Sequence, residues 1–129
     1  MKINFNNKEI IEKEINLHDY MFNGFTYNYL NNKIIVSISG FEETGLNELI
    51  FNDVIGFRMN SCDFWGSSPH ILCWECLNED DSFIIKDLNK ENENYKYSRL
   101  CYKTKYIQTV FVLSSGDKLD IACENIIIR

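Results

Sequence analysis

The chain has 129 residues, of which 45% are hydrophobic and 25% are charged, and its formal net charge is −6 at pH 7. This length and composition are typical of one globular domain (residues 1–129) that needs no disulfide or metal to build a core. The negative charge disfavours a nucleic-acid partner, and no apolar run is long enough for a signal peptide or a membrane span, so we expect a cytoplasmic protein without a membrane partner.

The first clear element is a β-hairpin over residues 25–38. Asparagine tolerates a positive φ better than most residues, so Asn31-Asn32 suits a two-residue type I′ turn. This turn would place Tyr27 opposite Val36 and separate an apolar face from a polar one, a separation that a slip by one residue would destroy. The apolar face would hold Phe25, Tyr27, Tyr29, Ile34, Val36 and Ile38.

Weaker patterns occupy the rest of the first two-thirds of the chain. Residues 7–16 fit either a short helix or a strand, and residues 60–69 and 88–94 are expected to be loops. No segment keeps a 3.6-residue apolar period over three turns, so little helix is expected. Further strands are predicted at residues 48–51, 54–59, 71–77, 82–87 and 97–102.

A second hairpin is predicted over residues 106–124. A three-residue loop at residues 115–117 would pair Leu113 with Leu119. Its first strand is apolar on both faces and should be central in a sheet or part of a closed one. Together the elements predict a mainly β fold, an antiparallel β-sandwich or small barrel of about eight strands with little helix. Inward-facing residues on the last strand would be Leu119, Ile121 and Cys123, and Lys118, Asp120 and Glu124 would face water.

The segment Cys73-Trp74-Glu75-Cys76 is a CxxC motif with Cys62 and His70 nearby, residue types that bind zinc or form a redox dithiol. On a strand, however, residues three positions apart point to opposite faces. We therefore expect no metal, no other cofactor and no catalytic residue here. Five cysteines, an odd number, are expected as free thiols: Cys62, Cys73, Cys76, Cys101 and Cys123.

Two segments supply candidate binding residues. Phe64 and Trp65 lie in a loop rich in turn residues, where aromatic side chains act as interface anchors or fold back to plug the open end of a β-fold. Glu79, Asp80 and Asp81 form a run of carboxylates between two predicted strands, which could meet a cation or basic side chains, or simply form a solvated turn.

Three stretches together resemble a known group of proteins: residues 17–19 (Leu-His-Asp), 49–54 and 111–123. The chain resembles small uncharacterised all-β proteins of low-GC Gram-positive bacteria, some of which are grouped with immunity proteins of polymorphic toxin systems. The resemblance covers most of the chain and implies a non-enzymatic binding role without catalytic residues. The neighbouring His18 and Asp19 do not by themselves indicate catalysis, because catalytic partners are set by position in space.

The sequence thus predicts a non-enzymatic binding protein of the immunity type that masks a basic toxin or another basic protein partner. Phe64 and Trp65 would anchor that partner, and the carboxylate run would steer it. One alternative is a small-ligand carrier whose mouth is lined by these two aromatics together with Tyr27 and Tyr29. The other is a zinc-dependent or thiol enzyme that uses the cysteine–histidine cluster.

Overall fold

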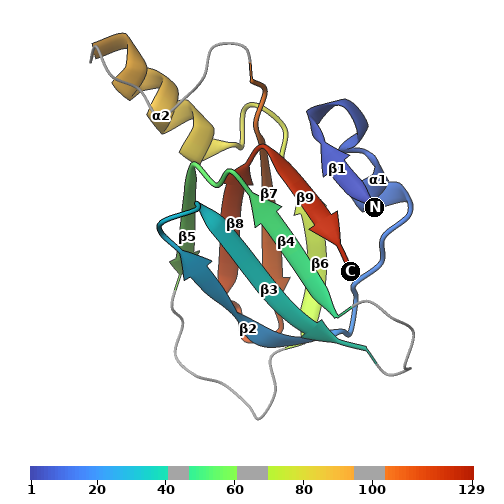
Figure 1. The fold of residues 1–129 in the computed structure, drawn as a ribbon. Coiled ribbons are helices and arrows are strands. Elements are labelled where there is room, and N and C mark those ends of the chain that lie inside the picture. The colour runs from blue at the N-terminus through green and yellow to red at the C-terminus, as the bar shows by residue number, and fades with distance from the viewer. Residues whose placement is uncertain (41–46, 61–69, 95–103) are drawn as a thin grey trace.

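The computed structural model describes residues 1–40, 47–60, 70–94 and 104–129, and these ranges form nine strands and three helices (Figure 1). The prediction of a mainly β, antiparallel fold with little helix is confirmed. None of the described helices is long and apolar enough to cross a membrane. The strands are β1 (Lys2–Asn4), β2 (Met21–Asn28), β3 (Lys33–Ser39), β4 (Glu48–Asn52), β5 (Gly56–Asn60), β6 (Ile71–Cys76), β7 (Ile107–Leu113), β8 (Lys118–Cys123) and β9 (Asn125–Ile128); the helices are the 3-10 helix η1 (Phe5–Asn7), α1 (Ile10–Lys13) and α2 (Phe83–Asn94).

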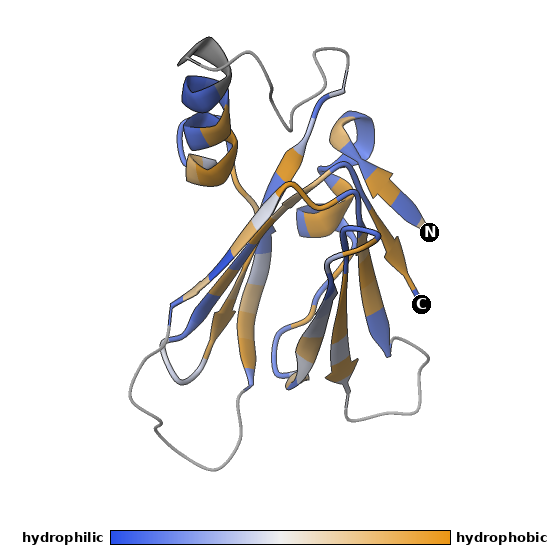
Figure 2. Ribbon diagram, turned by 60° about the vertical axis from the view of Figure 1, so that its left-hand side comes forward, coloured by the Kyte–Doolittle hydropathy of each residue, from blue (hydrophilic) through white to orange (hydrophobic). Residues whose placement is uncertain are grey.

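The strands form two antiparallel sheets that face each other as a sandwich (Figure 2). The five-stranded sheet has the order β1-β9-β4-β3-β2, and the four-stranded sheet has the order β5-β8-β7-β6. An isolated bridge between Met21 and His70 joins the sheets at one corner. Strand β7 lies inside its sheet, as its two apolar faces predicted, and α2 lies at one end of the sandwich.

An aromatic cluster occupies the core between the sheets, and Phe111 is its centre. The ring of Trp74 stacks on Phe111 with the centroids 5.4 Å apart and 12° between the planes. The rings of Phe22 and Phe51 approach Phe111 at 6.0 and 6.1 Å in tilted and edge-on orientations. These rings come from both sheets, so one core holds the two layers together.

The first hairpin forms, but its register differs from the prediction by two positions. Tyr27 pairs with Ile34 and Phe25 with Val36, so the predicted pairing of Tyr27 with Val36 is wrong. Because the difference is even, every strand residue keeps its predicted face. Val36 is fully buried, whereas Tyr29 leaves the sheet and is 78% exposed.

Side-chain capping of the loop explains this register. The Asn28 side-chain oxygen accepts hydrogen bonds from the backbone N–H groups of Leu30 at 3.0 Å and Asn31 at 3.4 Å. Asn32 takes a left-handed conformation with φ 51°, and its carbonyl accepts from the Val54 N–H at 2.8 Å. The loop between the two strands therefore has four residues, 29–32, instead of the predicted two. The hydrogen bonds of the Asn28 side chain stabilise this longer loop.

The second hairpin has a three-residue loop, one residue earlier than predicted. The loop is residues 114–116, and Gly116, at φ 91°, takes the left-handed position that closes such a loop. Phe111 therefore lies opposite Leu119, and the predicted pairing of Leu113 with Leu119 is wrong by two positions. The shift is again even, so the predicted core residues of β8 are buried.

Helix α2 is the main error of the sequence prediction, because residues 82–87 were expected to form a strand and residues 88–94 a loop. The apolar residues at its start face a small second cluster on the outer side of the four-stranded sheet. Gly56 makes this packing possible, since a Cβ there would lie 2.7 Å from the Ile84 side chain. This cluster is built by Ile55, Ile84 and Ala122, with Phe83, Ile85, Leu88 and Tyr106 packed against it.

The remaining predicted segments agree with the structure to different degrees. The strands predicted at 48–51 and 71–77 are confirmed to within one residue, and the strand predicted at 54–59 begins two residues later, at Gly56. The ambiguous segment 7–16 contains α1. The strand predicted at 97–102 and nearly all of the loop predicted at 60–69 lie outside the described residues.

A buried polar connection ties α2 to the sheet. Gln108 on β7 is fully buried, and its Oε1 accepts a hydrogen bond from the Ile84 N–H in the first turn of α2 at 3.0 Å. Its Nε2 donates to Asp120 Oδ1 on β8 at 3.1 Å. Asp120, which was predicted to face water, is only 6% exposed, so that prediction is wrong. Desolvation raises the pKa of the Asp120 carboxyl group, although the Gln108 hydrogen bond and the positive charges of Lys118 and Arg58 oppose the shift.

We expect the Asp120→Asn variant to gain stability relative to the wild type as the pH rises. A raised pKa means that the folded wild type binds a proton more tightly than the unfolded chain, so it loses stability as the pH rises through the folded-state pKa. The asparagine carries no charge, and its Oδ1 can still accept the hydrogen bond from Gln108. Urea unfolding of both proteins between about pH 4 and pH 7 measures the difference. A constant difference over this range would contradict the prediction.

Candidate functional site

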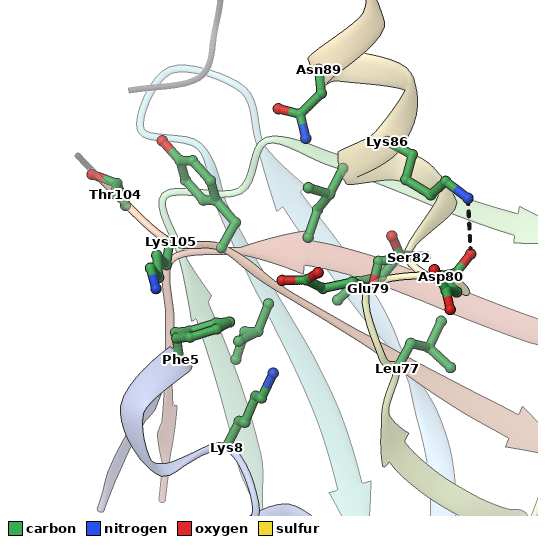
Figure 3. Close-up of a pocket in the computed structure, with 14 residues that line it drawn as sticks. Phe5, Lys8, Leu77, Glu79, Asp80, Ser82, Lys86, Asn89, Thr104 and Lys105 are labelled. Atoms are coloured by element: carbon green, nitrogen blue, oxygen red, sulfur yellow. Dashed lines mark hydrogen bonds between the residues drawn. The ribbon is translucent and has the colours of Figure 1, made fainter. Parts of the chain in front are cut away.

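Two neighbouring cavities open at one end of the sandwich and share Thr104 and Tyr106. One has a volume of about 540 Å³, and the other about 740 Å³. Both volumes lie within the range of small-molecule and side-chain binding pockets. We call the smaller one the lysine cavity, after Lys8, Lys86 and Lys105 in its lining, and it is drawn in Figure 3. The larger one is the tyrosine cavity, lined among others by Tyr27, Tyr29, Asp53, Phe57, Tyr106 and Glu124.

The aromatic wall of the tyrosine cavity comes from β2, β5 and the loop after β2. Strands β2 and β5 are edge strands of opposite sheets, so their side chains meet where the sandwich is open. The Tyr27 and Phe57 ring centroids are 4.9 Å apart at 58°, and the Tyr27 and Tyr29 rings are 6.3 Å apart and nearly perpendicular at 87°. The Tyr27 hydroxyl donates to Asn32 Oδ1 at 3.4 Å, which fixes the ring. Rings at such angles form a corner that presents π-faces to an occupant.

Two carboxylates complete the tyrosine cavity. Asp53 sits in the turn before β5 with a left-handed φ of 51°, and Glu124 lies between β8 and β9. A hydrogen bond of 3.2 Å from the Glu124 N–H to the Asn52 carbonyl joins the two turns. Burial raises the pKa of the Cys123 thiol, and the negative charges of Asp53 and Glu124 both add to this shift. The two carboxylates therefore act on the same thiol group. Within the described ranges, neither carboxylate forms an ion pair, and no lysine or arginine lies over Tyr27, Tyr29 or Phe57.

The lysine cavity lies between η1, the start of α2 and the segment before β7. The Nζ atoms of Lys8 and Lys105 are 4.2 and 4.8 Å from the Phe5 ring centroid. Lys86 donates from Nζ to the Asp80 carbonyl at 3.2 Å, and the Glu79 side chain extends into the cavity from the segment next to Asp80 (Figure 3). The cavity therefore combines three lysine side chains with the carboxylate residues Glu79 and Asp80.

The residues predicted to steer a partner lie at the lysine cavity and not at the tyrosine cavity. Glu79, Asp80 and Asp81 are exposed, in a turn that leads from β6 into α2 and not into a strand as predicted. Glu79 and Asp80 line the lysine cavity, so they face lysines of their own chain. The predicted anchors Phe64 and Trp65 lie outside the described residues, and their role stays a prediction.

The proposed zinc or dithiol cluster is not brought together in the described part of the chain. Cys76 faces the core beside Trp74, and Cys73, three positions away along β6, lies on the other face of the sheet. The His70 N–H donates to Ser114 Oγ at 3.1 Å, and Cys62 lies outside the described residues. Among the described residues, no group of three or more histidine, cysteine, aspartate or glutamate side chains could hold a metal ion.

His18 has a role in the fold. Its Nδ1 lies 2.8 Å from the Leu72 carbonyl, and its Nε2 lies 3.5 Å from Asp19 Oδ1. Asp19 has a left-handed φ of 68°, and its backbone N–H donates to the Ile71 carbonyl at 2.9 Å. The pair therefore fastens the turn before β2 to the start of β6, and both side chains are exposed.

The three described thiols should react in the order of their burial. Desolvation raises the pKa of Cys76 to about 11, and it also raises the pKa of the less buried Cys73 and of the fully buried Cys123. At pH 8, the Cys76 side chain is then a thiolate in only about one protein molecule in a thousand. In the native protein, iodoacetamide should label Cys73 first, Cys76 more slowly and Cys123 only after unfolding, as peptide mass spectrometry can measure. Labelling of Cys123 before Cys73 would contradict the packing of β8.

Sequence reasoning found part of the tyrosine cavity. Tyr27 and Tyr29 were named for the ligand mouth of the small-ligand alternative. Asp53, Phe57 and Glu124 were missed, because only the pairing of β5 with β8 and the contact between two turns bring them together. Comparisons of the chain with protein-family models, with curated proteins and with solved structures found no match.

Proposed function

We propose that the chain is a non-enzymatic binding protein of the immunity type, which binds a basic protein partner in the cytoplasm. The tyrosine cavity would receive lysine or arginine side chains of that partner. The observation that carries the proposal is the combination, in one cavity, of aromatic faces with the carboxylates of Asp53 and Glu124, neither of which has a cationic partner among the described residues.

This combination fits a cationic side chain for two physical reasons. The faces of tyrosine and phenylalanine rings attract an ammonium or guanidinium group, by about 0.5–2 kcal/mol for each contact. A carboxylate beside the rings supplies the opposite charge, and the pair is stronger where the aromatic wall excludes water. A net charge of −6 on the whole chain would also speed the approach of a basic partner.

The segments that carry the aromatic wall of the tyrosine cavity also expose apolar side chains. Leu30, in the loop that carries Tyr29, is 94% exposed, and Phe57 and Met59 on β5 are also partly exposed. Large apolar side chains exposed close together are typical of protein-binding surfaces. A partner that places a basic side chain in the cavity would cover these residues as well.

The experiment starts from the wild-type chain immobilised as bait in an extract of the source cells at low salt. A bound protein is identified by mass spectrometry, purified, and its association and dissociation rates are measured over a salt series. We expect a basic protein in a stoichiometric complex whose association slows as salt rises. Tyr29→Ala should increase the dissociation rate about tenfold or more, because an anchor at the interface is lost.

A matched pair of double variants tests where the steering charges lie. Asp53→Asn with Glu124→Gln should slow association and flatten its salt dependence. Glu79→Gln with Asp80→Asn changes the net charge equally, but at the lysine cavity, and should have a clearly smaller effect. If the second pair slows association as much as the first, or if the bound partner is not basic, the proposal is wrong.

A further inference from the structure

We infer that the lysine cavity is a separate binding site for a small organic anion, a carboxylate or a phosphate ester with an apolar body. This site is independent of the proposed function, because it would take a ligand of the opposite charge through different residues. The inference rests on the placement of three lysines, on the apolar part of the lining and on the cavity volume of about 540 Å³.

Two ammonium groups converge on one aromatic ring. Lys8 follows η1 and Lys105 precedes β7, so segments far apart in the sequence bring their Nζ atoms to 4.2 and 4.8 Å from the centre of Phe5. The two side chains lie on either side of the Phe5 ring, so both positive charges line the same cavity (Figure 3). In the described part of the chain, neither forms an ion pair with a carboxylate. An anion bound in the cavity beside the Phe5 ring would give these ammonium groups a charged acceptor.

The third lysine is also able to bind an anion. Lys86 uses its Nζ to donate to the Asp80 carbonyl at 3.2 Å, a neutral acceptor, and an ammonium group has three donors. Its position on α2 places it across the cavity from Lys8 and Lys105 (Figure 3). The surrounding lining supplies an amide from Asn89 and a hydroxyl from Thr104.

The rest of the lining explains why the ligand should carry an apolar body. Leu77, Ile85 and Ile107 all contribute to the cavity wall. A volume of about 540 Å³ is far larger than an inorganic anion requires and corresponds to a small organic molecule. The charged group of the ligand would lie at Lys8 and Lys105, and its apolar part would cover the leucine and the two isoleucines.

Glu79 limits the affinity of this site for an anion, so replacing Glu79 should change the affinity in the opposite direction to replacing a lysine. Its carboxylate extends into the cavity, where it repels an anion (Figure 3). Removing that charge should strengthen anion binding, whereas removing a lysine should weaken it. Lysines that only cover Phe5 by cation–π contact would show neither response.

The experiment titrates the full chain with octanoate and with octyl phosphate while amide shifts are followed by NMR, with uncharged octanamide as the control ligand. Both anions should shift the amides around Phe5, Lys8, Lys105 and Tyr106, and octanamide should bind at least tenfold more weakly. Lys8→Met and Lys105→Met should each weaken binding about tenfold, and Glu79→Gln should tighten it several-fold. Lys13→Met, on the exposed surface of α1, makes the same charge change outside the cavity and should have little effect.

Three results would overturn the inference. The first is shifts that do not map to the cavity. The second is an equal affinity for octanamide, which would indicate a purely apolar contact. The third is a loss of affinity in Lys13→Met as large as in Lys8→Met, which would indicate general charge attraction. Circular dichroism of each variant confirms that the fold is retained before its affinity is compared.

Discussion

Val36→Asp is expected to lower the free energy of unfolding by about 3–5 kcal/mol or more, enough to unfold most small domains. Val36 is fully buried between the sheets, opposite Phe25 on the neighbouring strand. A carboxylate at this position would lose its hydration without gaining a charged or hydrogen-bonding partner. Urea unfolding followed by circular dichroism measures the loss.

The adjacent residue provides the control for this prediction. Ile35 lies one position away on β3, on the outer face of the sheet, and is only half-buried. Ile35→Asp therefore keeps its charge in contact with water and should cost about 1 kcal/mol. Equal losses in the two variants would mean that the faces of β3 are assigned wrongly.

Phe111→Ala is expected to lower the free energy of unfolding by about 3–5 kcal/mol, the range for removing a large buried aromatic side chain. Phe111 is fully buried and its ring contacts the rings of Phe22, Phe51 and Trp74, so the change leaves a cavity that three large side chains cannot easily fill. Val112→Ala, on the other face of β7, should cost about 1 kcal/mol. If Phe111→Ala unfolds at the same urea concentration as the wild type, the aromatic cluster is not the centre of the core.

The alternation of apolar and polar residues predicted which face of each hairpin strand packs in the core, but it did not predict which residues pair, the exposure of Tyr29 or the burial of Asp120. In each hairpin the observed register differs by two positions, because loop chemistry decides it: the Asn28 side chain caps one loop, and Gly116 closes the other. The face that a side chain occupies depends only on whether its position is odd or even along the strand, so the predicted face is still correct after a shift of two positions.

Helix α2 could not be predicted for a different reason. The stretch beginning at Phe83 has three apolar residues in succession followed by polar ones, a pattern that fits a strand and then a loop. What stabilises the helix is remote in sequence: the Gln108 side chain and the surface formed by Ile55 and Ala122. The pattern of apolar and polar residues within one segment carries no information about contacts with residues that are distant in the sequence.

The candidate site was only partly accessible to sequence reasoning for a similar reason. The acidic run from Glu79 is conspicuous in the sequence, yet in the fold it meets lysines from three other places. Asp53 and Glu124 are isolated in the sequence and become neighbours only when two turns are joined by a backbone hydrogen bond. A binding surface made from turns depends on topology more than on any local motif.

The bond between Gln108 and the first turn of α2 also sets an order for folding. The acceptor of the Ile84 N–H lies on β7, inside the four-stranded sheet, and a helix of 12 residues is marginal in water by itself. We therefore expect α2 to form late and to exchange its amide hydrogens earlier than the strands of the core. Because α2 is one wall of the lysine cavity, this local opening would give a bound molecule a route in and out while the two sheets stay closed.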